Sequence, residues 1–281
     1  MDLQFTALQQ FLQRNLHHKT MKTVQTVSEW RALLTGYRAA GKSIGVVPTL
    51  GAWHAGHVSL CKVARRDCDV VVATLFVNPT QFDEAQDFEN YPRTEEADRR
   101  MMEAAGVDMV FMPSVEEMYP GGTSYSVQEA ELSSELCGAH RPGHFTGVLT
   151  VVMKLLQIVG ADRAYFGEKD YQQLQLIRGM VAAFFLQTEI VPCPTIREPD
   201  GLAMSSRNVR LSSEERALAP QFHAILKSAP DAALAEQQLR ALGFVVDYIE
   251  DKPDRRYGVP LSNHRGNQQT RGGRLFRAPA F

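Results

Sequence analysis

The chain has 281 residues, of which 44% are hydrophobic and 22% charged, and its formal net charge is −2 at pH 7. This length is enough for one large domain or two unequal ones with a sizeable core. The near-neutral charge gives no indication of nucleic acid or an anionic membrane as a partner. The longest apolar run covers residues 70–77 and is far shorter than the roughly 20 residues needed to span a bilayer, so it predicts a buried strand.

Residues 1–20 contain no apolar signal core and too few Arg and Ser for a transit peptide. We interpret them as an N-terminal extension ahead of Met21. The cysteines show no CxxC spacing, and we expect reduced structural thiols in a cytoplasmic protein. These cysteines are Cys61, Cys68, Cys137 and Cys193.

From Met21 onward, apolar runs alternate with stretches of helical periodicity. Strands are expected at 43–47, 69–77, 107–112 and 161–166, with a proline-rich extended segment at 189–196. Helices are expected at 27–40, 56–66, 94–105, 148–159 and 171–185, with Ser28, Thr94 and Asp170 as N-caps. Five alternations of strand and helix predict an α/β fold with a doubly wound parallel sheet.

The alternation stops near Pro194, where prolines cluster, and a smaller second domain is predicted to follow. Ser212 and Glu215 have the spacing of a capping box at the start of a helix. A second helix is expected at 232–242 and a strand at 244–250. Residues 251–281 carry seven Lys or Arg against two Asp and show little apolar periodicity, so we expect a disordered tail.

Residues 46–57 read VVPTLGAWHAGH and predict a phosphate site. A buried strand ends in a glycine-containing turn that opens a helix, and the free N–H groups of a helix start attract anions. His54 and His57 add further donors without a large fixed charge. A metal site is an alternative, but no third ligand of a suitable type lies nearby in the sequence.

Three more polar turns follow the predicted strands or the extended segment: NPTQF at 78–82, GEKD at 167–170 and MSSRN at 204–208. Ligands bind outside the carboxyl ends of strands in open parallel sheets, so the four turns are expected to form one site. Lys169 and the hydroxyl and guanidinium groups of 205–207 suit a phosphate chain, whereas Gln81 and Gln173 suit a hydroxyl or carboxylate. The sequence has no GxGxxG motif.

Six segments, in this order and spacing, resemble pantoate–β-alanine ligases (pantothenate synthetases) of the HIGH-motif nucleotidylyl-transferase superfamily: PTLGAWHAGH, FVNPTQF, YPRT, RPGHFTGV, YFGEKDYQQL and DGLAMSSRN. The resemblance covers about residues 21–250. It implies a Rossmann-like domain at 21–194 and a shortened C-terminal lid domain at 195–250. It also implies that pantoate and MgATP form pantoyl adenylate and pyrophosphate, and that β-alanine then displaces AMP to give pantothenate, on the route to coenzyme A.

The resemblance also assigns residues. His57 stands at the position of a proton donor, and His54 is expected to stabilise phosphate charge beside it. Gln81 and Gln173 are expected to bind pantoate, with Gln81 also near β-alanine, and Asp98 to help hold Mg²⁺, which would sit mainly on phosphate oxygens. The ATP site would comprise Leu50 (where the family usually has Met), Gly51, Ala52, Trp53, His54, Ala55, Gly56, His57, Gly167, Glu168, Lys169, Asp170, Ile196, Met204, Ser205, Ser206 and Arg207. The family further suggests a cytoplasmic homodimer.

Two alternatives to this function remain open from the sequence. Another adenylyltransferase of the HIGH superfamily would release pyrophosphate with a nucleotide acceptor, without pantoate and β-alanine. An ATP- or pantoate-binding homologue that does not catalyse is the second alternative, because residues 251–281 do not resemble the C-terminal strands and helices of the family.

Overall fold

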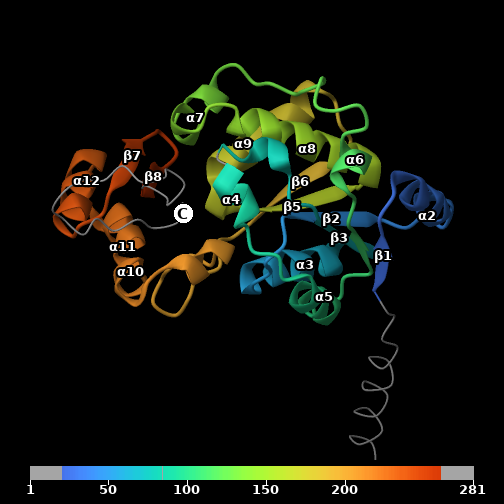
Figure 1. The fold of residues 1–281 in the computed structure, drawn as a ribbon, viewed down its shortest axis with the longest axis horizontal. Coiled ribbons are helices and arrows are strands. Elements are labelled where there is room, and N and C mark those ends of the chain that lie inside the picture. Colours follow the sequence, from blue (N-terminus) through green and yellow to red (C-terminus); the bar gives the residue numbers. More distant parts are fainter. Residues whose placement is uncertain (1–20, 84, 261–281) are drawn as a thin grey trace, which may run out of the picture.

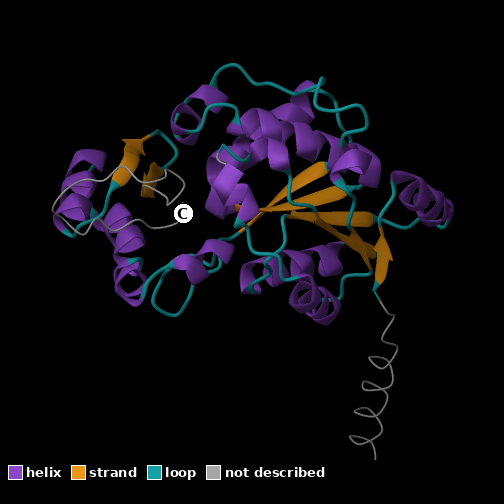
Figure 2. Ribbon diagram, in the orientation of Figure 1, coloured by secondary structure: helices purple, strands orange, loops and turns teal. Residues whose placement is uncertain are grey.

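The computed structural model describes residues 21–83 and 85–260. Six strands form one parallel sheet in the order β1-β4-β3-β2-β5-β6 (Figures 1 and 2). The strands are β1 (Lys22–Val24), β2 (Ile44–Thr49), β3 (Val70–Leu75), β4 (Met109–Phe111), β5 (Arg163–Gly167) and β6 (Glu189–Cys193). The chain runs outward from β2 through β3 to β4 and then returns to β5 on the other side of β2. The switch point between β2 and β5 is where such sheets bind ligands.

The doubly wound parallel sheet predicted from the sequence is therefore confirmed, and one strand was missed. β1 has only three residues and lies at the edge of the sheet, so it carries no periodic signal. The remaining strand predictions differ from the structure by a few residues at their ends, where pattern alone fixes boundaries poorly.

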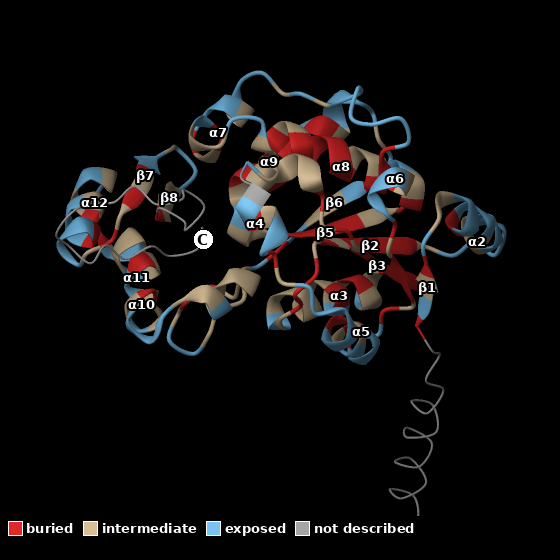
Figure 3. Cartoon of the chain, in the orientation of Figure 1, coloured by how far each residue is buried: buried red, intermediate tan, exposed pale blue. Residues whose placement is uncertain are grey.

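Helices cover both faces of the sheet (Figure 1). Residues alternate along each strand, so Val46 packs with one helical layer and Val47 with the other. The layer on one face consists of α3 (Ala55–Asp67) and α5 (Glu95–Ala104), and that on the other of α2 (Val27–Ala39), α8 (His144–Val159) and α9 (Tyr171–Ala183). Figure 3 shows the buried strands between these layers. Three short helices lie in the connections: α4 (Ala85–Glu89), α6 (Val115–Met118) and α7 (Cys137–His140).

Of the four predicted N-caps, Thr94, Asp170 and Ser212 stand at the N-cap position, although Thr94 and Asp170 make no side-chain capping bond, and Ser28 is wrong. Thr26, not Ser28, caps α2 in a capping box with Glu29. The Thr94 hydroxyl donates to Asp98 and makes no capping bond, and the Asp170 side chain accepts from Lys169 instead of capping α9. The capping box of Ser212 and Glu215 is confirmed.

The C-terminal part has its own hydrophobic core, which contains Phe222, Leu239 and Phe244. It consists of α10 (Ser213–Leu218), α11 (Pro220–Ser228) and α12 (Ala232–Ala241), followed by an antiparallel hairpin of β7 (Val246–Asp251) and β8 (Arg256–Pro260). In Figure 1 these elements lie to one side of the parallel sheet.

The prediction of a disordered tail from Asp251 onward is wrong for its first ten residues, 251–260. Asp251 ends β7 and pairs with Arg256 of β8, whose guanidinium also donates to the carbonyls of Leu226 and Ala229. Polar contacts thus hold β8 against β7, which is why apolar periodicity predicted the first strand of the hairpin, at 244–250, but not β8. The rest of the predicted tail, residues 261–281, and the N-terminal extension, 1–20, lie outside the described residues.

Two further sequence expectations concern thiols and membranes. All four cysteines are free. Among the described helices, none combines the length and the apolar character that crossing a membrane requires.

Candidate functional site

A cavity of about 670 Å³ lies at the carboxyl ends of β2 and β5 and reaches the C-terminal helices and hairpin. Residues from all four predicted turns line it, so the turns meet at one cavity, as their places after the strands predicted. The lining residues from the turns are Leu50, His54, Gly56, His57, Gln81, Gly167, Glu168, Lys169, Asp170, Met204, Ser205, Ser206 and Arg207, and Gln173 and Ile196 join them.

The two histidines are fixed by the start of α3. His54 is the N-cap, and its Nδ1 accepts a hydrogen bond from the Gly56 amide at 3.1 Å. The Nδ1 of His57 accepts from the His54 amide at 3.3 Å, and the ring centroids lie 4.1 Å apart. A Cβ on Gly56 would come within 2.7 Å of the His54 ring, so glycine is required at this position.

Both imidazoles are held neutral. Burial, followed by the charge of Lys169, lowers the pKa of His54 to about 4. Burial, then His54 and Lys169, lowers the pKa of His57 to about 3. Because each Nδ1 accepts a backbone hydrogen bond, each neutral ring carries its proton on Nε2. The pair therefore offers two N–H donors at the cavity without positive charge.

Asp98 organises the turn that leads to these histidines. Its side chain is buried and accepts hydrogen bonds from the amides of Ala52 and Trp53 at 2.9 and 2.8 Å, and from the Thr94 hydroxyl at 2.9 Å. Ala52 has a φ of 53°, in the left-handed region that disfavours residues with a Cβ. The two bonds to Asp98 stabilise this unusual backbone, and they occupy both carboxylate oxygens.

Five residues assigned to the ATP site or metal do not line the cavity. Gly51, Ala52, Trp53 and Asp98 are buried behind it, and Ala55 is exposed on α3. Their contribution is to shape the turn. Within residues 21–83 and 85–260, no group of three or more His, Cys, Asp or Glu could hold a metal ion.

The NPTQF turn is held by Asn78, which is fully buried. Its side-chain amide donates to Gln81 Oε1 at 3.1 Å and to the Gly147 carbonyl at 3.2 Å, and its Oδ1 accepts from Tyr119 at 2.7 Å. A Cβ on Gly147 would lie 2.2 Å from the Thr80 carbonyl oxygen. Gln81 is thus placed by a buried asparagine and by close packing of α8.

His144 and Arg141 also fix Gln81, and our sequence reasoning assigned them no role. His144 Nδ1 donates to the Gln81 carbonyl at 2.7 Å, and its Nε2 accepts from Arg141 at 3.3 Å. Arg141 pairs with Asp83 at 2.6 Å. Burial, then the nearby Arg141, lowers the pKa of His144 to about 4. The RPGHFTGV motif contained these residues, but their partners are about 60 positions away in the sequence.

The GEKD turn supplies the cationic side of the cavity. Lys169 lies at the first turn after β5, and its Nζ is 3.3 Å from Asp170 Oδ1. Enclosure of the Asp170 carboxyl would raise its pKa, but Lys169, with Arg207 and His144 nearby, outweighs this effect and lowers it. The neighbouring Gln172 also lines the cavity, but its side-chain amide donates to the carbonyls of Leu132 and Glu135, which leaves the amide of Gln173 for a ligand.

The loop from Pro194 onward folds back on itself. The Met204 amide donates to the Ile196 carbonyl at 2.9 Å, so two residues eight positions apart reach the cavity together. Ser205 caps the following turn and accepts from the Arg207 amide at 3.2 Å. Arg207 Nη2 contacts Asp87 Oδ2 at 3.2 Å, while its buried Nε has no hydrogen-bond partner among the described residues.

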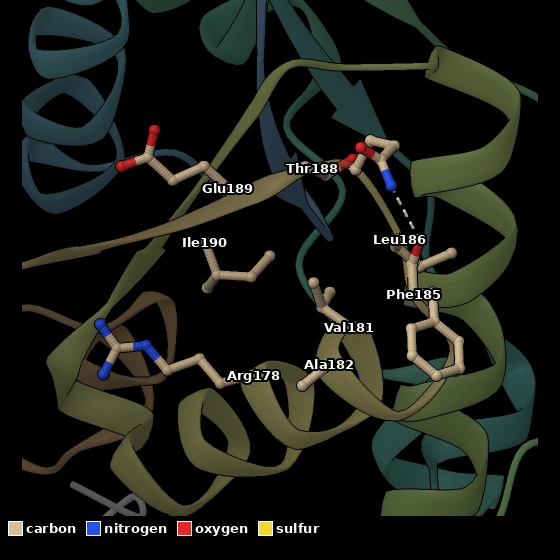
Figure 4. A pocket seen from close by; sticks show the side chains of 9 residues that line it. Arg178, Val181, Ala182, Phe185, Leu186, Thr188, Glu189 and Ile190 are labelled. Atoms are coloured by element: carbon tan, nitrogen blue, oxygen red, sulfur yellow. Dashed lines mark hydrogen bonds between the residues drawn. The ribbon is translucent and has the colours of Figure 1, made fainter.

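A second, shallower groove of about 380 Å³ lies at the end of α9 beside the edge strand β6 (Figure 4). Val181, Leu186 and Ile190 point into it, and only Arg178 and Glu189 bring charge. It has none of the convergent donors of the larger cavity, so we assign the chemistry to the larger one. Phe185, which is 85% exposed, lines this groove, and Phe184, which is 54% exposed, precedes it in the chain.

Comparisons with known proteins agree with this assignment. A family model described as pantoate-beta-alanine ligase matches residues 22–262. The chain is similar to a pantothenate synthetase of Bdellovibrio bacteriovorus, with 49% identity over 239 residues, 85% of this chain and 93% of the relative. It is similar in structure to pantothenate synthetase from Thermus thermophilus, with a TM-score of 0.75 and 47% identity over 82% of this chain and 86% of that one.

A further similar structure is a pantoate-beta-alanine ligase from Francisella tularensis, solved as a complex with beta-gamma ATP and beta-alanine. Its TM-score is 0.81 at 37% identity, over 85% of this chain and 93% of that one.

Proposed function

The chain belongs to the pantoate-beta-alanine ligase family, and from this premise we propose which of its residues carry the reaction. It is an ATP-using ligase that condenses pantoate with β-alanine to give pantothenate, AMP and pyrophosphate through pantoyl adenylate. The observation that best supports a site for this chemistry is the convergence of four polar turns on one cavity at the β2–β5 switch point.

In the first step, a carboxylate oxygen of pantoate forms a bond to the α-phosphorus of ATP as the bond to pyrophosphate breaks. Negative charge then accumulates on the leaving phosphates. His54 and His57 present neutral Nε2–H donors to this charge, and Lys169 and Arg207 present cations. Donors that are already fixed need little rearrangement as the charge develops.

Gln81 and Gln173 hold pantoate beside the phosphates. Both line the cavity, and Gln81 is held through its backbone carbonyl by His144 and through its side chain by Asn78. Correct alignment of a carboxylate with the α-phosphorus can supply several kcal/mol of the barrier reduction.

In the second step, the β-alanine amine attacks the acyl carbon, the bond to AMP breaks and the amine loses a proton. The adenylate must be kept from water until then. The contacts of the C-terminal part support its role in excluding water. The rings of Tyr248 and His140 stack with their centroids 5.5 Å apart, and Lys252 Nζ lies 2.9 Å from Glu135 Oε2. We propose that residues 195–260 act as the lid domain, which extends ten residues, including β8, beyond the 195–250 that the sequence predicted.

Magnesium enters this scheme on the nucleotide. Asp98 has both oxygens occupied by backbone amides, and the described residues form no carboxylate cluster, so the chain does not fit as a direct magnesium site. Mg²⁺ would instead be held by the phosphate oxygens of ATP.

The remaining proposals concern the protein as a whole. Phe185, which lies in the groove beside the edge strand β6 (Figure 4), and its exposed neighbour in the chain, Phe184, support a homodimer, in line with the family resemblance. Four free cysteines support a reducing compartment such as the cytoplasm.

Substrate dependence of product formation tests the function. We expect pantothenate and AMP in equal amounts only when ATP, pantoate and β-alanine are all present. Pyrophosphate release with a nucleotide acceptor alone would favour another adenylyltransferase, and binding of MgATP without any product would favour a non-catalytic homologue.

A further inference from the structure

We infer that Asp87, on α4, is a positioning residue for the ligase reaction: with Tyr91 it holds the Arg207 guanidinium at the phosphate end of the cavity. This inference rests on the proposed function of Arg207. Asp87 lies outside the four turns from which the candidate site was assembled, and it does not line the cavity.

Two ion pairs of Asp87 reach toward the loop that carries Arg207. The Asp87 residue is only 5% exposed. Its Oδ2 accepts from Arg207 Nη2 at 3.2 Å and its Oδ1 from Arg210 Nη1 at 2.9 Å. Arg210 Nη2 in turn donates to the Asn90 carbonyl at 2.7 Å. The buried Asp87 carboxylate thus binds two arginines that lie more than a hundred positions after it in the sequence. It connects their loop to the segment that precedes α5.

Tyr91 supports the same guanidinium from another side. The Arg207 Cζ lies 5.5 Å from the centre of the Tyr91 ring, and the Tyr91 hydroxyl is 3.3 Å from the Ser206 Oγ. Tyr91 is 5% exposed and lines the cavity. Ring and carboxylate together restrict a side chain that would otherwise sample many rotamers.

The Nε of Arg207, a buried donor without a hydrogen-bond partner among the described residues, indicates a ligand. Asp87 engages one terminal nitrogen of Arg207, while the buried Nε of Arg207 has no hydrogen-bond partner among the described residues. Arg207 also lies near enough to Asp170 and His144 to shift the pKa of both. A phosphate oxygen between these groups would accept a hydrogen bond from the unpaired Nε of Arg207, since the planar guanidinium suits an anion. Asp87 would then fix the direction from which Arg207 donates.

Steady-state kinetics and MgATP titration of single and double variants test this role. We expect Asp87→Asn, which keeps the shape but removes the charge, to raise the KM for ATP about 10-fold and leave the KM for β-alanine within about 2-fold. Asp87→Glu should recover most of the loss. Glu89→Gln, at an exposed carboxylate on the same helix, should behave as wild type.

The double variant separates positioning from general support. If Asp87 acts through Arg207, then Asp87→Asn should add little to the effect of Arg207→Ala. Arg210→Ala, which leaves the Asp87–Arg207 pair in place, should change the KM for ATP by less than about 2-fold. Additive effects, or an Arg210→Ala defect equal to that of Asp87→Asn, would overturn the inference.

Two measures keep the test decisive. If Asp87→Asn does not fold, Tyr91→Leu tests the same guanidinium, with several-fold weaker MgATP binding expected and unchanged binding contradicting the inference. Calorimetric titration with MgATP needs no turnover, so it distinguishes a failure of this inference from a failure of the proposed function, in which wild type forms no pantothenate.

Discussion

Replacement of Asp98 is the most informative single perturbation, because the sequence and the structure give this residue different roles. The resemblance suggested a contact to Mg²⁺, whereas the structure shows it bonded to the amides of Ala52 and Trp53. In Asp98→Ala both amides lose their partner inside the protein. Each buried unsatisfied donor costs about 1–3 kcal/mol, so the expected loss in the free energy of unfolding is about 4 kcal/mol.

Thermal unfolding and magnesium titration together measure the two roles. A loss of about 4 kcal/mol should lower the Tm by roughly 10 °C in a chain of this size. Asp98→Asn keeps one acceptor oxygen and should cost about half as much. Glu103→Ala, at an exposed site on the same helix, is the control and should change stability by less than about 0.5 kcal/mol.

The magnesium dependence decides between the interpretations. If Asp98 holds the turn, the Mg²⁺ concentration for half-maximal activity of Asp98→Asn stays near that of wild type while the Tm falls. An unchanged Tm with a markedly higher magnesium requirement would refute the reasoning from the backbone bonds.

Three further predictions follow from single contacts. Gly147→Ala should lower the free energy of unfolding by about 1–3 kcal/mol and raise the KM for pantoate, because the added Cβ would overlap the Thr80 carbonyl beside Gln81. The control is Gly179→Ala, whose Cβ would meet no atom within 4 Å. This variant should be as stable as wild type, or more stable, in urea unfolding. His57→Ala should lower the rate of adenylate formation by ~10²–10³, measured as pyrophosphate release, since it removes a transition-state donor. The pKa of His144 is about 4 in the folded protein against 6.5 unperturbed, so between these values only the unfolded chain binds the proton. Stability should therefore fall as pH drops below about 6.5, by about 2 kcal/mol from this residue at pH 5, and the pH slope of the urea midpoint should be shallower in His144→Gln.

Each of these predictions has an outcome that would contradict it. Wild-type pantoate affinity in Gly147→Ala would contradict the packing argument, and near-wild-type turnover in His57→Ala would remove that residue from the mechanism. An unchanged pH slope in His144→Gln would show that its protonation is not linked to folding.

The sheet and the position of the site could be predicted because both depend on local patterns. Continuous apolar runs identified the buried strands, and the polar turn after each strand fixed which residues reach the carboxyl edge. The start of α3 could also be predicted locally, since a glycine and two histidines three residues apart form its N-terminal cap.

The residues that sequence reasoning missed act through distant partners. Asp87 meets Arg207 from 120 positions away, and His144 meets Gln81 from 63. No periodicity or spacing rule reports such pairs, because tertiary packing alone brings them together. The strand β8 was missed for a related reason: ion pairs rather than an apolar face stabilise the charged end of its hairpin with β7.

Transfer of oxygen from pantoate to AMP tests the central claim most directly. Pantoate labelled with ¹⁸O in both carboxylate oxygens is condensed with β-alanine in the presence of ATP. The ¹⁸O content of AMP and pantothenate is then measured by mass spectrometry. Formation of pantoyl adenylate in this cavity predicts one labelled oxygen in each AMP and one in each pantothenate. AMP without label, with its new oxygen taken from water, would contradict attack by the pantoate carboxylate on the α-phosphorus.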